Sequence, residues 1–424
     1  MCCPPDPVRP LGSAAVDAVP APGVTAVDLI MTLDWLIIGG GIHGVHIAAR
    51  LLGDAHISPE RLRIVDPGDR LLARWRSCTE ATGMSHLRSP SVHHLGIEHG
   101  ALQRFARKHK RERSSRFALP FERPSLELFN THCDEVEEIY GLADLHISNQ
   151  AVSCSVDCDR VSVRLVDGKE LEAKNLVLAI GASDQPHWPD WAPRCNQRVH
   201  HVFDPGFDGW PTSSETVVVI GGGISAGHVV LRLLEEGHDV HLVSRHTLRQ
   251  HQFDSDPGWL AWKYTNVFSR ELDFDHRRGL ITDARHTGSV SPEIGRALRR
   301  AITRNRIQWH EAEVTQLAST SDRLEVALST DATVCADRVL LATGFDSQRP
   351  GGSMIDELIT SASLPCSGCG YPIVDTSLRW HPRIFVSGPL AELELGPVSR
   401  NIAGARRAGD RILDAIRATS ATVN

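Results

Sequence analysis

The chain has 424 residues, of which 41% are hydrophobic and 23% are charged. This balance is ordinary for a globular protein of two or three domains and argues against a disordered or fibrous chain. Lysine and arginine number 45 against 52 aspartate and glutamate residues, so the net charge of −7 gives no general attraction to nucleic acid or to an anionic membrane.

The first 30 residues are rich in Ala, Pro and Val and precede the first strand-like run. They lack a basic start, a continuous apolar stretch and a clear cleavage site, which argues against a secretory signal. We expect residues 1–30 to be a disordered extension. No apolar run reaches the roughly 20 residues that a membrane span requires. The ten cysteines are therefore expected to be reduced thiols of a cytoplasmic protein.

A glycine-rich motif follows the first predicted strand. The sequence GGGIHG at 39–44 opens an apolar helical stretch, and the next predicted strand ends at Asp66. In such a βαβ unit Gly39 makes the tight turn, Gly41 lets the backbone approach a pyrophosphate, and Gly44 lets the helix pack against the strand. The helix N-terminus then binds phosphates, and Asp66 accepts hydrogen bonds from ribose hydroxyls. The alternative is a glycine-rich turn that binds no ligand.

Residues 67–130 form an insert that we expect to build the active site. Trp75 follows the Asp66 strand closely enough to reach the first nucleotide site, with an ordinary core tryptophan as the alternative. Arg88, in the sequence MSHLRSP, could contact NADPH or an anionic substrate, or be a plain surface residue. The basic run at 104–116 is typical of a solvated helix face, and the functional alternative is a docking surface for an acidic partner.

The first copy of this arrangement closes with a hairpin and a buried strand. Residues 161–166 and 170–173 behave like strands on either side of an Asp-Gly turn signal. The apolar run at 176–180 is typical of a buried parallel strand, and Gly181 ends it.

The same arrangement repeats in the second half of the chain. An apolar strand precedes GGGISA at 221–226, a helix follows, and the next predicted strand ends at Ser244 and Arg245. A strand-like run at 324–328 and the sequence VLLATG at 339–344 mirror the earlier close. An acid at the strand end would repel a 2′-phosphate, whereas an arginine and a hydroxyl accept it, so this copy favours NADPH over NADH. The alternative for Arg245 is a solvated surface charge.

Two dinucleotide folds, the second nested inside the first, describe a flavoprotein that a nicotinamide cofactor reduces. The expected fold class is α/β with two Rossmann-like domains, each doubly wound in three layers, and with the NADPH domain inserted in the FAD domain. We expect residues 31–205 to begin the FAD-binding domain, 206–344 to form the NAD(P)H-binding domain, and 345–424 to complete the FAD-binding domain. In the last segment a strand ends at Gly388, and a helix at 401–416 would aim its N-terminus at the flavin pyrimidine, where its dipole stabilises negative charge.

These motifs together resemble the class B flavin monooxygenases and, within them, the ornithine and lysine N-hydroxylating branch. Ser225 and Ala226 match the branch's G-x-G-x-S-A nicotinamide motif. Asp337 and the sequence ATGF at 342–345 match its Asp followed by an A-T-G-aromatic motif. The sequence MSHLRSP at 84–90 is similar to a motif in the branch's first insert.

The resemblance implies an FAD-dependent, NADPH-using monooxygenase that hydroxylates a small nucleophilic substrate, an amino-acid side-chain amine above all, through a C4a-hydroperoxyflavin. The oxidised nicotinamide would stay bound and shield this intermediate from water. The chain departs from the branch at Phe345, where tyrosine is typical, and at Arg88, where lysine is typical. Arginine does not replace lysine neutrally, because its planar fork binds differently.

The residues expected to bind FAD or NADPH belong to the two glycine motifs, the strand ends, the insert and the return segment: Gly39, Gly41, Gly44, Asp66, Trp75, Arg88, Gly181, Gly221, Gly223, Ser225, Ala226, Ser244, Arg245, Thr343, Gly344, Gly388 and Leu395. No catalytic acid or base is assigned. We expect no metal site, because the histidine pairs lack ligand-spaced Cys or carboxylate neighbours. The expected partners are a small-molecule substrate and O₂, with no nucleic acid and no membrane, and the sequence leaves room for an oligomer.

Two other functions remain open. Cys366 and Cys369 form a C-x-x-C motif, which in a flavin oxidoreductase of the disulfide or quinone type would carry redox chemistry without oxygen insertion. The position of the motif in the return segment, outside the nicotinamide domain, argues against that role. A non-catalytic dinucleotide-binding sensor is the third interpretation, and His43 inside the first glycine motif gives it slight support.

Overall fold

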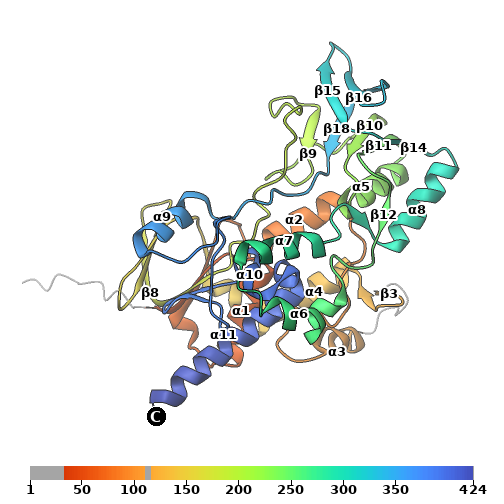
Figure 1. Ribbon diagram of the computed structural model, residues 1–424. Helices are drawn as coiled ribbons and strands as arrows, with labels where there is room; N and C mark the ends of the chain where they lie inside the picture. The colour runs from red at the N-terminus through yellow and green to blue at the C-terminus, as the bar shows by residue number, and fades with distance from the viewer. Residues whose placement is uncertain (1–32, 110–115, 424) are drawn as a thin grey trace, which may run out of the picture. The chain divides into compact units, whose positions relative to one another are not determined.

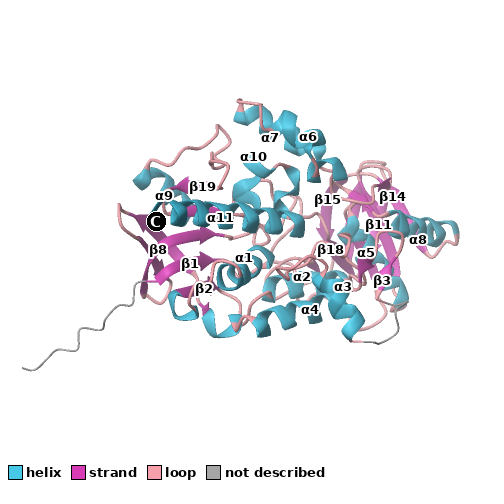
Figure 2. Ribbon diagram, turned by 90° about the horizontal axis from the view of Figure 1, so that it is seen from below, coloured by secondary structure: helices cyan, strands magenta, loops and turns pink. Residues whose placement is uncertain are grey.

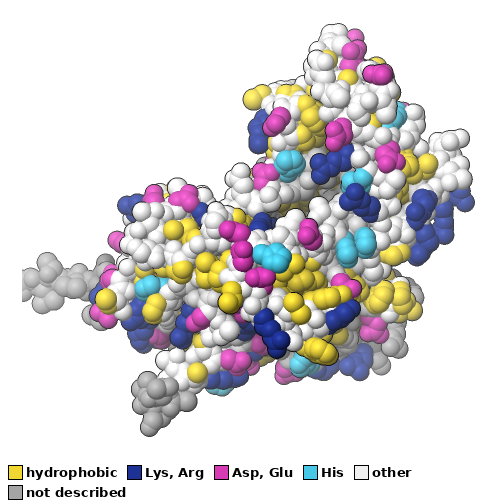
Figure 3. All heavy atoms as spheres, viewed as in Figure 1, with side chains coloured by type: hydrophobic (Ala, Val, Ile, Leu, Met, Phe, Trp, Pro, Cys, Tyr) yellow, Lys and Arg dark blue, Asp and Glu magenta, His cyan; other side chains and the backbone are white. Residues whose placement is uncertain are grey.

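The computed structural model describes residues 33–109 and 116–423. The predicted extension at 1–30 and the centre of the predicted basic run, residues 110–115, lie outside this range. On the face shown in Figure 3, basic and acidic side chains are interspersed. In the described residues, no helix is long and apolar enough to cross a membrane.

The first sheet is an open, largely parallel sheet with the strand order of a doubly wound fold. Its strands lie in the spatial order β19 (Arg379–His381), β20 (Ile384–Val386), β8 (Glu170–Leu178), β1 (Leu33–Ile38), β2 (Leu62–Asp66) and β5 (His146–Ser148). The strands from β20 to β5 are parallel, so the C-terminal segment returns to complete a sheet begun at residue 33. Because parallel strands are covered on both faces, the apolar side chains of β1 and of residues 176–178, where β8 pairs with β1, are almost entirely buried.

One predicted feature of this sheet differs in the structure. The hairpin strand at 170–173 and the parallel strand at 176–180 are one strand, β8. Its first half pairs antiparallel with β7 (Val161–Leu165), and its second half pairs parallel with β1. Lys174 and Asn175, between the two predicted strands, are part of β8, because the strand continues without interruption while its pairing partner changes from β7 to β1. The antiparallel strand β6 (Ala151–Val156) completes the hairpin extension.

The second sheet repeats the arrangement and is parallel throughout. Its order is β14 (Ile307–Glu311), β11 (Asp239–Ser244), β10 (Thr216–Ile220), β18 (Arg338–Leu341) and β9 (Val199–His201). Strand β9 precedes the boundary predicted at residue 205, yet it pairs with β18 of this sheet. An antiparallel meander follows β14, formed by β15 (Val314–Ser319), β16 (Leu324–Leu328) and β17 (Thr333–Ala336). Nearly every predicted strand of this half is thus present. The confirmed fold class is α/β with two Rossmann-like sheets.

The helices cover these sheets in two groups. In the first, α1 (Ile42–Gly53) packs against the C-terminal helix α11 (Ile402–Val423) beside β1 and β8 (Figure 2). In the second, α5 (Ile224–Glu235) packs against α8 (Pro292–Thr303) beside β10 and β11 (Figure 1). The remaining helices are α2 (Ala73–Thr82), α3 (Ala101–Lys108), α4 (Leu126–Ile139), α6 (Trp262–Phe268), α7 (Phe274–Ala284), α9 (Gly352–Ala362) and α10 (Glu392–Leu395).

The short elements connect these layers. They are the two-stranded sheets β3 (Phe117–Ala118) with β4 (Arg123–Pro124) and β12 (Arg249–Gln250) with β13 (Ser289–Val290), and the 3-10 turns η1 (Pro59–Arg61), η3 (Leu142–Leu145), η4 (Pro257–Leu260), η5 (Gly388–Ala391) and η6 (Pro397–Arg400).

A small apolar core joins the two halves of the chain. Trp259, Phe268 and Ile281 come from the segment with α6 and α7, whereas Tyr371 and Leu393 come from the return segment. The stretch 257–284 therefore leaves the second sheet, although it lies inside the predicted NAD(P)H-binding domain, and packs on the first. Burial of these large side chains contributes roughly 2 kcal/mol each, which makes the contact a stable one.

Candidate nucleotide sites and the pocket between them

Of the three glycines assigned a role in the first motif, Gly39 and Gly44 are required by the fold, and Gly41 faces open space. Gly39 has φ 109°, and a Cβ there would collide with the carbonyl oxygen of Ala179 at the end of β8. A Cβ at Gly44 would collide with the carbonyl oxygen of Gly39, so the helix reaches the turn only without a side chain. A Cβ at Gly41 would meet nothing within 4 Å. This empty space at the helix start is where a ligand could approach the backbone.

The first turns of α1 and α5 have backbone N–H groups that no side chain of residues 33–109 or 116–423 caps. Gly41 and Gly223 are their N-cap residues, with no capping hydrogen bond and no acidic residue in the first turn. By contrast, Ser125, Asp273 and Ser291 cap α4, α7 and α8 with side-chain oxygens. Free N–H groups and the positive end of the helix dipole are the elements of an anion site. Both motifs therefore fit the phosphates of a dinucleotide.

Asp66 lies at the edge of the first motif, at the end of β2. Its Oδ2 accepts a hydrogen bond from the Gly40 N–H at 2.6 Å, and its Oδ1 accepts one from the Gly68 N–H at 2.9 Å. These bonds hold the carboxylate in place, and each oxygen keeps a lone pair for a ribose hydroxyl.

The second motif has the same backbone geometry. Gly221 has φ 144°, and its Cβ would lie 2.5 Å from the carbonyl oxygen of Ala342 at the end of β18. Ala226 takes the place of the third glycine and is buried. The His246 ring borders this turn, 2.7 Å from where a Cβ of Gly222 would be, whereas the Leu71 side chain lies 2.8 Å from the equivalent position at Gly40. No residue pattern in the sequence indicated this imidazole.

The two residues predicted to discriminate NADPH lie in different environments. The Ser244 side chain is buried, donates to the carbonyl of His246 at 3.0 Å and accepts from Trp309 Nε1 at 3.0 Å. Arg245 is exposed and, among the described residues, has no hydrogen bond or ion pair. At the end of β11 the Arg245 guanidinium is therefore available to a ligand, whereas the Ser244 hydroxyl already has two hydrogen-bond partners in the protein.

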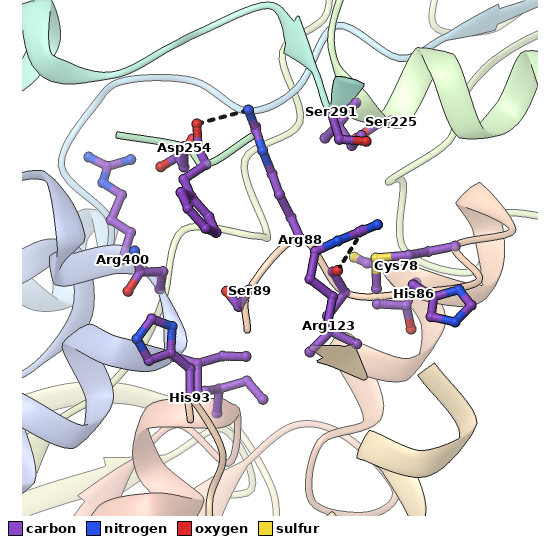
Figure 4. Close-up of a pocket in the computed structure, with 18 of the residues that line it drawn as sticks. Cys78, His86, Arg88, Ser89, His93, Arg123, Ser225, Asp254, Ser291 and Arg400 are labelled. Carbon is purple, nitrogen blue, oxygen red and sulfur yellow. Dashed lines mark hydrogen bonds between the residues drawn. The ribbon is translucent and has the colours of Figure 1, made fainter. Parts of the chain in front are cut away.

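A pocket of about 680 Å³ lies between the two motifs (Figure 4). Gly41 and Ile42 of the first motif line it, as do Ile224 and Ser225 of the second. The rest of its wall is mainly apolar and comes from the insert, the 253–260 loop, the start of α8, the start of α11 and the two segments that join the sheets, residues 183–203 and 342–345, which we call the linker. Its residues include Trp75, Met84, Arg88, His93, Arg123, His228, Phe253, Asp254, Leu260, Glu293, Phe345, Val398, Arg400, Asn401 and Ile402.

Arg88 crosses from the insert to the second half of the chain. Its Nε donates to the carbonyl of Gln252 at 3.0 Å, and its Nη2 donates to the carbonyls of His251 and Phe253 and to the Ser289 hydroxyl. Figure 4 shows the side chain extended toward this loop. Burial lowers the pKa of Arg88, opposed by the charge of Asp254. Arg88 therefore lines the pocket, but its hydrogen bonds go to the 251–253 loop and to Ser289.

The linker residues build a joint between the two halves. The Thr343 hydroxyl donates to the carbonyl of His187, and the carbonyl of Gly344 accepts from the His187 N–H at 3.0 Å. Phe345 stacks on Phe203 with ring centroids 4.7 Å apart and lines the pocket. Of this motif, the aromatic residue thus reaches the pocket, whereas Thr343 and Gly344 are engaged in the linker.

Of the other predicted residues, some line the pocket and others do not. Trp75 lines it, and its Nε1 donates to Asn130 Oδ1 at 3.0 Å. Gly181 and Gly388 both have φ 66° and follow β8 and β20, at the carboxyl edge of the first sheet. Leu395 is buried in the core at the end of α10 and does not line the pocket.

Sequence reasoning missed several residues that line the pocket, among them Asn401, His228 and Asp254. Asn401 precedes α11 and caps it, since its Oδ1 accepts from the Gly404 N–H at 3.1 Å. His228 comes from the second turn of α5, and Asp254 comes from the loop that Arg88 holds. The Asn before an apolar helix is a recognisable cap signal. The other two residues carry no local signal.

The C-x-x-C motif forms a tight turn away from the pocket. The Ser367 hydroxyl lies 3.1 Å from Cys369 Sγ, and neither Cys366 nor Cys369 lines the pocket. Burial raises the pKa of the Cys366 thiol. The cysteines of the described residues are free thiols, and no cluster of three or more potential metal ligands occurs among those residues.

Three solved structures illustrate what the chain is similar to in fold. An ornithine N-hydroxylase from Kutzneria sp. 744, with reduced FAD, NADP⁺ and L-ornithine, has a TM-score of 0.71 at 17% identity, over 92% of this chain and 100% of its own. A FAD-bound cadaverine monooxygenase from Erwinia amylovora has a TM-score of 0.70 at 15% identity, over 91% and 94%. A bacillithiol disulfide reductase from Bacillus cereus has a TM-score of 0.61 at 19% identity, over 92% and 99%.

No curated protein sequence matches the chain. Residues 36–272, which include both glycine motifs and the insert between them, match the family model of the pyridine nucleotide-disulphide oxidoreductases. The match spans more than half of the 424 residues. The protein therefore belongs to the pyridine nucleotide-disulphide oxidoreductase family.

Proposed function

We propose that the protein is an FAD- and NADPH-dependent monooxygenase that hydroxylates the nitrogen of a small amine. The observation that carries this proposal is that one pocket is lined by the first turns of both nucleotide motifs. A flavin and a nicotinamide held by the two motifs would meet in that pocket. When bound, FAD accepts a hydride from NADPH and activates O₂.

The first motif, with Asp66, fits the FAD diphosphate and ribose. The free N–H groups of α1 and the open space at Gly41 support this assignment. We place the FAD-binding domain at 33–178 and 352–423, because strands from both stretches form one sheet. The start of α11 lines the pocket, where its N–H groups and dipole would stabilise negative charge on the flavin pyrimidine.

The second motif fits NADPH. Its free first turn on α5 would bind the diphosphate, and the exposed guanidinium of Arg245 at the end of β11 would pair with the 2′-phosphate. We place this domain at 199–341, bounded by the strands β9 and β18.

The pocket residues suit the hydroxylation of a neutral amine. The balanced reaction is R–NH₂ + O₂ + NADPH + H⁺ → R–NHOH + NADP⁺ + H₂O, in which nitrogen gains one oxygen atom and the other leaves as water. Burial lowers the pKa of His93 and His228 to about 4. Both imidazoles are therefore uncharged at neutral pH and do not repel a cationic substrate. The apolar wall excludes water from the reacting atoms.

A flavin oxidoreductase of the disulfide or quinone type is the second candidate, favoured by the fold of the bacillithiol disulfide reductase. Against its thiol version stands the position of Cys366 and Cys369 outside the pocket. A non-catalytic sensor would bind the nucleotides without turnover.

The experiment is to purify the protein with its flavin, add NADPH and air, and measure O₂ uptake, hydrogen peroxide and hydroxylamine with a panel of primary amines. We expect one hydroxylamine formed for each NADPH oxidised with a suitable amine. Stoichiometric peroxide with every amine, or colourless protein that takes up no FAD, would refute the monooxygenase.

A further inference from the structure

Each arginine that lines the pocket already donates from two of its three side-chain nitrogens to the described part of the protein, so none keeps two adjacent nitrogens free for a carboxylate. A guanidinium binds a carboxylate best through two parallel N–H donors, such as its Nε and one Nη. In the described part of the chain, each pocket arginine already uses such an edge on the protein. The partners are the carbonyls of Ser183 and Phe203 for Arg74, the 251–253 carbonyls for Arg88, Glu293 and the Leu87 carbonyl for Arg123, and Glu392 with the Tyr371 hydroxyl for Arg400.

Asp254 is the opposite case, an acidic side chain left unpaired in a fixed loop. Its carbonyl accepts from the His286 N–H at 2.8 Å, and Arg88 holds the preceding residue, Phe253. The following residue, Ser255, forms a β-bridge with Arg285. The carboxylate itself makes no hydrogen bond or ion pair with the described residues, and it lines the pocket. In Figure 4 Asp254 and Arg400 lie on one side of the pocket, across from Cys78 and His86.

This loop is held rigidly enough to present a charge. The rings of His251 and His286 stack with centroids 3.7 Å apart, and the Phe253 ring packs edge-on against Phe121 at 5.0 Å. Leaving a carboxylate unpaired in a half-buried position costs free energy unless a cation binds it. The charges of Arg88 and Arg285 offset this cost only at longer range, since neither guanidinium contacts Asp254.

We propose that the substrate is a small aliphatic diamine without a carboxylate, and that Asp254 binds the ammonium at the end remote from the oxidised nitrogen. This inference rests on the proposed N-hydroxylating function and narrows its substrate class from amino acids to diamines. The amine near the flavin reacts in its neutral form, while the distal amine stays protonated and pairs with the carboxylate. A diamine supplies the cation that Asp254 lacks. It brings no carboxylate, for which the pocket arginines have no pair of free donors.

The test compares three probes that differ by one group each. 1,5-Diaminopentane has two amines, L-lysine adds a carboxylate to the same skeleton, and 1-aminopentane lacks the second amine. KM is measured from hydroxylamine formation by the holoenzyme, and Kd from equilibrium binding to the oxidised holoenzyme. The variants are Asp254→Asn and, as a matched control, Asp283→Asn, an exposed acid on α7 away from the pocket.

For the wild type we expect KM and Kd of 1,5-diaminopentane to be at least about tenfold lower than those of either other probe, the range of one charge-assisted hydrogen bond. Asp254→Asn should raise both constants for the diamine by about ten- to a hundredfold and leave those for 1-aminopentane within about twofold. Asp283→Asn should change neither.

A lower KM and Kd for L-lysine than for 1,5-diaminopentane would overturn the inference. So would an equal change in KM and Kd for the monoamine and the diamine on Asp254→Asn, because it would mark Asp254 as structural. If the diamine binds tightly, Asp254→Asn abolishes that binding and no probe yields hydroxylamine, the binding site stands and the monooxygenase activity is refuted. The two claims therefore fail separately.

Discussion

Replacing Gly41 by aspartate should separate the stability of the fold from the binding of FAD. The Gly41 backbone has φ −79° and ψ −167°, which any residue adopts, and its Cβ would meet nothing within 4 Å. An aspartate at this N-cap position would cap α1 and face the helix dipole. We expect the apoprotein to gain about 0.5 kcal/mol of unfolding free energy.

The same carboxylate would repel the FAD diphosphate. Two unit charges about 4 Å apart interact by about 4 kcal/mol at the effective dielectric constant of a protein surface, which corresponds to a roughly thousandfold loss of affinity. Gly41→Asn is the matched control, because it caps the helix with nearly the same shape and no charge. Gly39→Ala is the opposite control: its positive φ and the collision with Ala179 should destabilise the fold itself.

Thermal unfolding of the apoprotein and a fluorescence titration with FAD measure the two effects. We expect Gly41→Asp to unfold at or above the wild-type temperature and to purify without flavin, with Gly41→Asn between the two in affinity. FAD affinity within about threefold of wild type for Gly41→Asp would show that the diphosphate does not bind at the start of α1, and the assignment of the first motif would be wrong.

Four further outcomes are expected. Gly223→Asp should raise the KM for NADPH at least about thirtyfold by the same repulsion and leave the FAD content unchanged, as absorbance and steady-state kinetics would show. Arg245→Ala should raise the KM for NADPH about tenfold or more but not that for NADH; an equal rise for both would exclude a 2′-phosphate contact. Cys366→Ser and Cys369→Ser should leave NADPH turnover within about twofold, whereas loss of turnover would favour the disulfide oxidoreductase. Burial lowers the pKa of His94 to about 2, so the unfolded chain takes up this proton as the pH falls below about 6.5 and stability decreases. Between pH 7.5 and 5.5 His94 alone should cost about 1.4 kcal/mol, and urea unfolding of His94→Leu should lack that part of the decrease.

The repeated nucleotide motifs could be predicted from the sequence because their signals are local. The turn at Gly39 needs a positive φ, and the strand before it is buried on both faces, so glycine and continuous apolar runs occur side by side in the chain. The same holds for Gly221 and β10. The cap residue Asn401 also follows from local chemistry. Short-range sterics and burial therefore decided the fold class and the positions of most strands along the chain.

Only the tertiary structure decided which polar groups are free. Arg88 and the 251–253 carbonyls are more than 160 residues apart in the chain, and the same arginine could have faced solvent or a ligand. The packing of 257–284 on the return segment and the pairing of β9 with β18 are also long-range choices that no periodicity reports. A side chain such as Asp254 is available to a substrate only if no distant donor reaches it. Its availability therefore depends on how the whole chain packs, whereas the backbone turns that precede α1 and α5 depend on a few neighbouring residues.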